Sequence, residues 1–166
     1  MNVLAVIPAR MASSRFPGKP LAYILGLPMV EHVRRRVSLC PLIHDVVVAT
    51  CDREILDAVT ACGGKAVMTA STHERGTDRI AEAARAVSCD IVLNVQGDEP
   101  LIAPMLIREC ALCLTTHEEA AIATLAHPLF GPMIIEWQQY GSIPWRTKIV
   151  AIVLMSSTLG VSIVFF

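Results

Sequence analysis

The stretch Val6-Ile-Pro-Ala-Arg-Met-Ala-Ser-Ser-Arg-Phe-Pro-Gly-Lys-Pro-Leu21 places three cations in one short segment near the amino terminus. The cations are Arg10, Arg15 and Lys19. The segment follows an apolar run, Val3 to Ile7, that predicts a buried first strand. Arginine presents a planar fork to phosphate oxygens and lysine a point charge, so the loop suits a polyanion such as a triphosphate. The alternative is a solvated basic loop, which the two prolines and the position directly after a strand disfavour.

The composition indicates a globular domain with reduced thiols. The chain has 166 residues and a net charge of −1, so we do not expect it to bind nucleic acid. Its six cysteines lie in apolar segments, and the chain starts with a strand pattern rather than a secretory signal. We therefore expect reduced thiols and a cytoplasmic protein. Cys110 and Cys113 match C-x-x-C without a second pair, which favours buried helix positions over metal or redox use.

Strand patterns and helix patterns alternate along the chain. Short apolar runs predict strands at Asp45–Thr50, Lys65–Thr69, Asp90–Val95 and Ala120–Ala126. Helical spacing predicts helices at Met29–Leu39, Arg53–Cys62, Thr77–Val87 and Pro104–Thr115. Asp52 is the predicted N-cap of the second helix. The alternation predicts an α/β fold with a mostly parallel sheet covered on both faces, whose ligands bind at the carboxyl ends of the strands.

The turn Gln96-Gly-Asp-Glu-Pro100 follows one of these strands. A carboxylate held at a strand end near a triphosphate is a natural Mg²⁺ ligand, because Mg²⁺ prefers hard oxygen donors together with phosphate oxygens. Asp98 is therefore the candidate metal ligand. The alternative is a surface turn in which Asp98 or Glu99 caps the next helix.

A second polar loop, Thr69-Ala-Ser-Thr-His-Glu-Arg-Gly-Thr-Asp-Arg79, leads into a helix. The free N–H groups near Gly76 can meet an acceptor on a base or a sugar. Three side chains are further candidates for contact with this ligand: Ser71, Arg75 and Arg79. The alternative pairs Arg79 with Glu82 on the helix surface and leaves His73 as a solvated loop histidine.

These motifs together indicate a nucleotidyl transfer reaction. Cations cradle the phosphates, the metal neutralises their charge, and the hydroxyl of an acceptor attacks the α-phosphate while pyrophosphate leaves. The basic loop does not fit G-x-x-x-x-G-K-[ST], which disfavours a P-loop NTPase. No G-x-G-x-x-G follows the first strand, which disfavours a dinucleotide oxidoreductase.

Four segments together resemble the 3-deoxy-manno-octulosonate cytidylyltransferase (CMP-Kdo synthetase) family. They are Ile7–Leu21, Val48–Asp52, Val67–Thr69 with His73 and Gly76–Arg79, and Val95–Ile102. The resemblance implies a Rossmann-like nucleotidyltransferase fold, a three-layer sandwich that is incomplete at the carboxyl end. It also implies that the enzyme uses Mg²⁺ to transfer CMP from CTP to the acidic sugar Kdo. Pyrophosphate is the second product, and the pathway is lipopolysaccharide biosynthesis.

The resemblance carries site residues with it. It implies catalytic roles for Arg10, Arg15 and Lys19, and a metal-ligand role for Asp98. It also implies that nine residues surround the nucleotide: Ala9, Arg10, Ser13, Arg15, Lys19, Ser71, Gly76, Arg79 and Gln96.

The sequence departs from the family pattern in two places. Cys51 stands where the family usually has an acidic residue. Beyond His127 the resemblance stops, so we expect a nucleotide-binding domain over residues 1–127 and a divergent hydrophobic tail over 128–166. The family's sugar pocket and homodimer segment would be missing. A non-catalytic remnant that binds CTP is therefore the alternative function.

The tail itself has three interpretations. It is an out-of-frame segment, a helix or strand packed over the sheet, or a membrane anchor. We do not expect the anchor, because the uncharged run Ile149–Phe166 only just reaches the length that spans a membrane.

Overall fold

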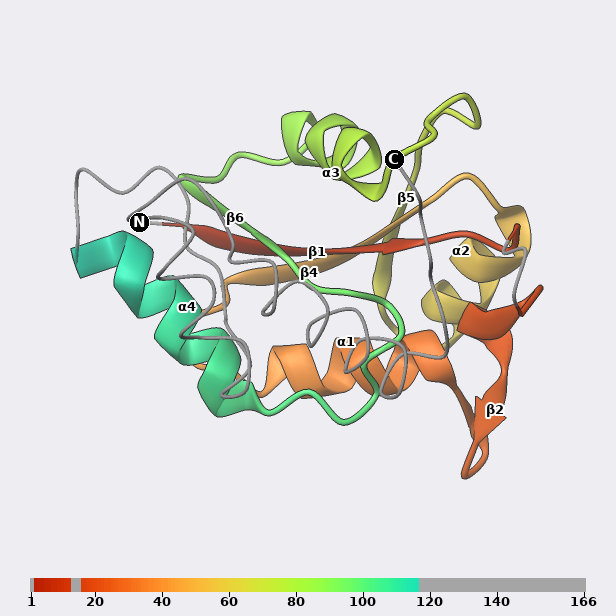
Figure 1. Cartoon of the computed structure of the whole chain (residues 1–166), viewed down its shortest axis with the longest axis horizontal. Helices are drawn as coiled ribbons and strands as arrows, with labels where there is room; N and C mark the ends of the chain where they lie inside the picture. The colour runs from red at the N-terminus through yellow and green to blue at the C-terminus, as the bar shows by residue number, and fades with distance from the viewer. Residues whose placement is uncertain (1, 13–15, 117–166) are drawn as a thin grey trace, which may run out of the picture. The chain divides into compact units, whose positions relative to one another are not determined.

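A computed structural model describes residues 2–12 and 16–116 of the chain. The centre is a four-stranded sheet in the order β5-β4-β1-β6 (Figure 1). The strands are β1 (Val3–Ala9), β4 (Asp45–Thr50), β5 (Lys65–Met68) and β6 (Ile91–Asn94). Every neighbouring pair is parallel, as the sequence predicts. The predicted strand Ala120–Ala126 and the tail 128–166 lie outside the described residues.

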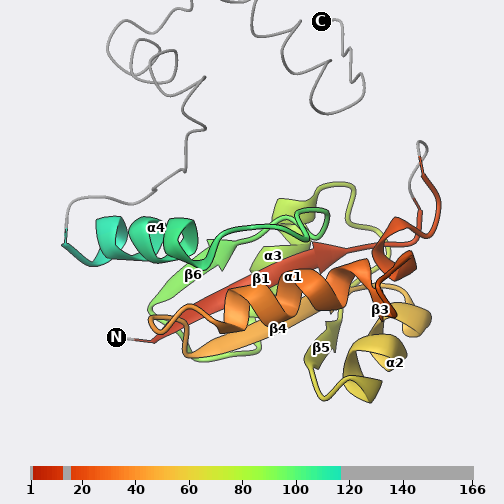
Figure 2. The same cartoon turned by 90° about the horizontal axis from the view of Figure 1, so that it is seen from below.

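Helices cover both faces of this sheet. They are α1 (Met29–Ser38), α2 (Arg53–Ala61), α3 (Gly76–Arg85) and α4 (Pro104–Thr116). Figure 1 shows α3 on one side of the sheet and α1 with α4 on the other, and Figure 2 shows the same arrangement from below. The three-layer α/β architecture predicted from the sequence is therefore confirmed.

Alternate residues of β1 build two separate cores. Ala5 and Ile7 pack with apolar residues of α1, α2 and α4 in the larger cluster. Leu4 and Val6 pack with Ile80 and Ala83 of α3 in the smaller one. Successive side chains of a strand point to opposite faces, so a strand that is apolar at every position is buried on both sides.

The strand β1 runs two residues further than the sequence predicts, through Pro8 to Ala9. Proline lacks an N–H and is normally excluded from central strands. Pro8 is tolerated here because its missing N–H would face β6. On that side of β1 the last ladder bond is made two residues earlier, where the Val6 carbonyl accepts the N–H of Val95. The paired register with β6 ends at Val6 and Asn94, whereas pairing with β4 continues to Ala9 and Thr50.

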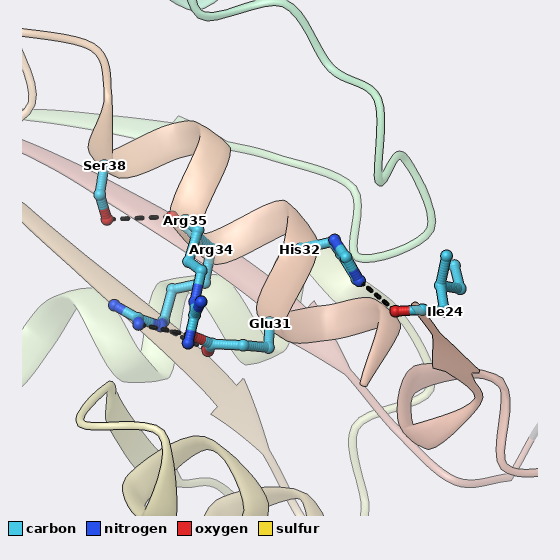
Figure 3. Close-up of polar contacts among 6 residues, drawn as sticks. All are labelled: Ile24, Glu31, His32, Arg34, Arg35 and Ser38. Carbon is cyan, nitrogen blue, oxygen red and sulfur yellow. Dashed lines mark hydrogen bonds and ion pairs between the residues drawn. The ribbon is translucent and has the colours of Figure 1, made fainter. Parts of the chain in front are cut away.

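A small hairpin between β1 and α1 is absent from the sequence-based prediction. It consists of β2 (Tyr23–Ile24) and β3 (Leu27–Pro28) and follows the 3-10 turn η1 (Lys19–Leu21). Leu25 and Gly26 at its tip both have positive φ, 48° and 85°. Such turns normally carry Asn-Gly or Asp-Gly, so the Leu-Gly pair gave no signal. His32 of α1 donates from Nε2 to the Ile24 carbonyl at 2.6 Å and ties the hairpin to the helix (Figure 3).

Helix α1 carries a buried carboxylate, Glu31, that two arginines neutralise (Figure 3). Arg34 donates to it from Nε and Nη2, both at 2.7 Å, and Arg35 donates from Nε at 2.6 Å. Burial alone would raise the pKa of Glu31, but the hydrogen bonds and charges of the two arginines outweigh it and hold the pKa below its usual value. Glu31 therefore enters the core as a paired anion.

Two further observations concern helix length and the thiols. Within residues 2–12 and 16–116, no helix combines the length and the apolar character that a membrane span requires. In the same part of the chain, no disulfide joins the cysteines, which are Cys40, Cys51, Cys62, Cys89 and Cys110.

We predict that Glu31→Gln lowers the free energy of unfolding by about 3 kcal/mol at neutral pH, because it leaves two arginines without a buried counter-charge. The pKa of Glu31 is lowered in the folded state. The stability that Glu31 contributes is therefore present above its unfolded pKa, about 4.3, and is lost as the pH falls through the folded pKa. Urea unfolding at several pH values measures this difference. Asp57→Asn breaks only the exposed pair with Arg53 and should cost about 0.5 kcal/mol or less. Equal losses for the two variants would contradict the account.

Candidate functional site

The basic loop that follows β1 is closed at its base by Met11. The Met11 N–H donates to Asp52 Oδ2 at 2.7 Å, and the Met11 carbonyl accepts the N–H of Gly18 at 3.0 Å. Gly18 has a φ of 73°, a left-handed conformation that glycine adopts without strain. The loop therefore begins and ends at one point, at the carboxyl ends of β1 and β4. Ser13 and Arg15 lie in this loop outside the described residues.

Asp52 is the N-cap residue of α2, as the sequence predicts, but its side chain has another role. It occupies the N-cap position of α2 but makes no capping hydrogen bond from its side chain. Its carboxylate accepts the Met11 N–H instead, and the Cys51 thiol lies 3.6 Å from the same oxygen. The predicted N-cap position is therefore confirmed, but a distant backbone donor takes the carboxylate in place of the helix's own N–H groups.

Lys19 and Asp98 meet at the same edge of the sheet. Lys19 Nζ lies 2.8 Å from Asp98 Oδ2, although the two residues are 79 positions apart in the chain. Both side chains are partly exposed, so a ligand can reach them. Gly97 allows the turn to approach β1, since a Cβ atom there would lie only 3.0 Å from the Pro8 carbonyl oxygen. The sequence-based expectation that the basic loop and the Asp98 turn converge is matched by this geometry.

Beside this pair lies a polar hollow of about 180 Å³. It is formed by the end of β1, the loop before α3, the start of α3 and the residue Gln96 after β6. Its lining residues are Pro8, Ala9, Arg10, His73, Glu74, Arg75, Gly76, Arg79 and Gln96. Pockets that enclose a whole drug-sized ligand measure about 300–1,000 Å³, so this hollow suits one part of a nucleotide. The rest would extend along the basic loop toward Lys19.

The structure brings most of the predicted nucleotide-binding residues to this hollow. Five of them line it: Ala9, Arg10, Gly76, Arg79 and Gln96. Lys19 and Asp98 form their ion pair outside its lining. Ser71 is exposed in the loop after β5 and does not line the hollow. Arg10 and Gln96 are exposed, so they are available to a ligand.

Two alternatives considered for the second polar loop are wrong. Arg79 is 3% exposed and donates from Nη1 to Thr69 Oγ1 rather than pairing with Glu82 on the helix surface. His73 is 24% exposed, lines the hollow and pairs through Nε2 with Glu82. The sequence contains one signal for the pair of His73 and Glu82, because the histidine stands just before a helix and the glutamate lies about two turns into that helix. The same spacing also fits a solvated loop histidine.

The oxygen donors of the Asp98 turn fit a hard divalent cation. Glu99 lies beside Asp98, and its pKa is raised by partial burial and by the negative charge of Asp98. A group of three or more His, Cys, Asp or Glu side chains that would hold a metal alone does not occur in the described ranges. A metal here would therefore need ligands from a substrate, as is usual for Mg²⁺ bound with phosphates.

A second hollow, of about 240 Å³, lies at the opposite edge of the sheet. Its charged side chains already have partners. Lys65 pairs with Asp45 at 2.7 Å, and Arg34 is held by Glu31. His44 Nδ1 accepts the N–H of Val3. This hollow lies at the amino ends of β4 and β5, away from the edge where parallel sheets bind ligands.

Residues 4–139 match the family described as cytidylyltransferase. The chain belongs to the cytidylyltransferase family. The match extends to residue 139, beyond residue 127, where we expect the resemblance to end from the sequence. The chain is 46% identical to a 3-deoxy-manno-octulosonate cytidylyltransferase of Geobacter metallireducens over 142 residues. This alignment covers 82% of the chain and 56% of the relative. The chain thus spans little more than half the length of this curated relative.

One solved structure agrees with the family assignment, and a more distant one shares the fold. CMP:2-keto-3-deoxy-manno-octonic acid synthetase complexed with CTP superimposes with a TM-score of 0.70 and 44% identity, over 72% of this chain and 49% of that one. Rv0371C of Mycobacterium tuberculosis, solved in complex with manganese, is 13% identical with a TM-score of 0.52 over 69% of this chain and 60% of that one. The second comparison bears on the fold alone.

We predict that Asp52→Ala speeds amide hydrogen exchange at Met11 by about tenfold or more, because the N–H loses a charge-assisted hydrogen bond. Asp52→Asn keeps an acceptor oxygen and should retain most of the protection. Exchange measured by NMR distinguishes the two variants. Unchanged exchange in Asp52→Ala would show that Asp52 does not close the loop.

Proposed function

We propose that this chain binds CTP at the carboxyl edge of its sheet and transfers CMP from CTP to Kdo, with release of pyrophosphate. The single observation that carries the proposal is the meeting of Lys19 and Asp98 beside a hollow that Arg10 lines. The 46% identity to a 3-deoxy-manno-octulosonate cytidylyltransferase supports the choice of CTP and Kdo. We further propose residues 1–127 as the nucleotide-binding domain, and the cytoplasm as the compartment.

The residues of the chain act by binding and positioning. Arg10 and Lys19, together with Arg15, bind phosphate oxygens and stabilise the negative charge that develops on the leaving pyrophosphate. The hollow holds the nucleoside part beside Gly76, Arg79 and Gln96, and the phosphate end reaches it beside Arg10, which also lines it. The acceptor hydroxyl of the sugar then forms a bond to the α-phosphorus, the bond to the β-phosphate oxygen breaks, and pyrophosphate leaves. Little covalent chemistry is required of the protein.

The proposed metal is Mg²⁺, with Asp98 as its protein ligand. The oxygen-only donor set of Asp98 and Glu99 at an exposed turn suits it. When bound there, Mg²⁺ supplies positive charge to the phosphate oxygens. Lys19 is the counter-charge of Asp98 in the unliganded chain and becomes available to phosphate once another cation neutralises that carboxylate.

Calorimetry with CTP and Mg²⁺, together with a pyrophosphate-release assay with CTP and Kdo, tests the proposal. Binding accompanied by release supports the transferase. Binding without release would instead support a non-catalytic remnant that binds CTP. This alternative is specific to the chain because the chain matches only 56% of its relative's length. The absence of both would overturn the proposal.

We predict that Asp98→Asn weakens Mg²⁺-dependent CTP binding by about tenfold or more, since even outer-shell partners of metal ligands are worth that much. Without Mg²⁺ the same variant should bind CTP as well as the wild type or better, because a repelling carboxylate is gone and Lys19 is released. Titrations with and without Mg²⁺ measure both effects. Asp57→Asn, the same change on the exposed face of α2, should alter neither titration. A uniform loss in both conditions would remove Asp98 from the metal site.

A further inference from the structure

An imidazole–carboxylate pair, His73 and Glu82, lies beside the hollow and is not used by the function proposed above. His73 Nε2 pairs with Glu82 Oε2, and the same oxygen accepts the N–H of Ala70 at 3.0 Å. Glu82 is therefore anchored to the loop at two points, and it fixes the position of the His73 ring. The His73 side chain is 24% exposed and lines the hollow.

The pairing leaves one ring nitrogen for a ligand. Because Glu82 is a carboxylate, His73 donates to it from Nε2 and carries a proton there. Nδ1 makes no hydrogen bond within the described part of the chain. When the ring is neutral, Nδ1 is an acceptor and repels an anionic oxygen; when the ring is protonated, Nδ1 becomes a charged donor and attracts one.

The charges around His73 have opposing effects on its protonation. Glu82 of α3 and Glu74 of the loop favour the imidazolium form, whereas Arg10 after β1, Arg75 of the loop and Arg79 of α3 oppose it. Glu82 makes the direct contact. The pKa of Glu82 is lowered by the Ala70 N–H and by His73, so this carboxylate stays ionised throughout the range in which an imidazole titrates.

We propose that His73 is a binding residue of this hollow, that its protonation strengthens the binding of an anionic nucleotide, and that Glu82 is the positioning residue that holds its ring. The inference rests on the proposed function, since it takes CTP as the ligand. It adds a residue to the site and a pH dependence to binding.

The test is CTP titration of the wild-type chain and of His73→Gln between about pH 5.5 and 8.5, the range that spans imidazole titration. Phosphate groups of the ligand titrate in the same range, but equally for both proteins, so the ratio of the two Kd values isolates His73. We expect His73→Gln to bind about tenfold more weakly at the acidic end, where it lacks a charged donor. The ratio should fall toward one at the alkaline end. This convergence also shows that the variant is folded.

Glu82→Gln tests the positioning role. It keeps an acceptor for the Ala70 N–H but removes the negative charge that favours the imidazolium form, so the midpoint of the pH-dependent binding should move to lower pH. NMR of the His73 ring signals follows its protonation in the unliganded chain. Glu109 on α4 pairs with Arg108, and Glu109→Gln should leave the binding midpoint and the His73 ring signals unchanged. An unaltered His73 titration in Glu82→Gln overturns the role of Glu82.

The outcomes separate the two proposals. A wild-type chain that binds CTP with a Kd ratio independent of pH overturns the role of His73 and leaves the proposed function intact. A wild-type chain that binds no CTP at any pH overturns the proposed function and this inference together.

Discussion

The parallel pairing of β1 with β4 on one side and β6 on the other is the constraint on which the site depends. Val6 lies opposite Val47 and Asn94, so all three strands point their carboxyl ends at the same edge. The segments that follow them therefore meet in space. The basic loop follows β1, Asp52 follows β4 and Asp98 follows β6. The chemistry of the site gathers at these three strand ends and at the loop between β5 and α3, and the two cores hold the strand ends in register.

Each of these segments is fixed by a contact to a neighbour. Asp52 holds the base of the basic loop through Met11, and Asp98 pairs with Lys19. Partly exposed ion pairs contribute little to stability because water screens them. The Lys19–Asp98 pair is therefore better understood as two opposite charges that an incoming metal–phosphate ligand can separate. The buried pair of Glu31 with Arg34 differs, since its carboxylate has no access to solvent.

The sequence predicted the elements of the sheet well, because apolar runs and helical spacing are local signals. The strand Asp45–Thr50 has the same bounds in the prediction and in the structure. The convergence of Lys19 and Asp98 follows because the carboxyl ends of parallel strands meet at one edge of a sheet. The hairpin after η1 carries no Asn-Gly signal, so it escaped prediction. The partners of Asp52, His73 and Arg79 could not be predicted from the sequence, because several groups lie within reach of each side chain and tertiary packing selects one of them.

The central claim is that one nucleotide site forms at the carboxyl edge of the sheet. NMR of the isotope-labelled chain titrated with CTP and Mg²⁺ tests it directly. The account predicts chemical-shift changes concentrated at the end of β1, at Lys19, in the loop before α3 and at the Gln96–Asp98 turn. Changes centred instead on the opposite hollow, around His44 and Lys65, would contradict it.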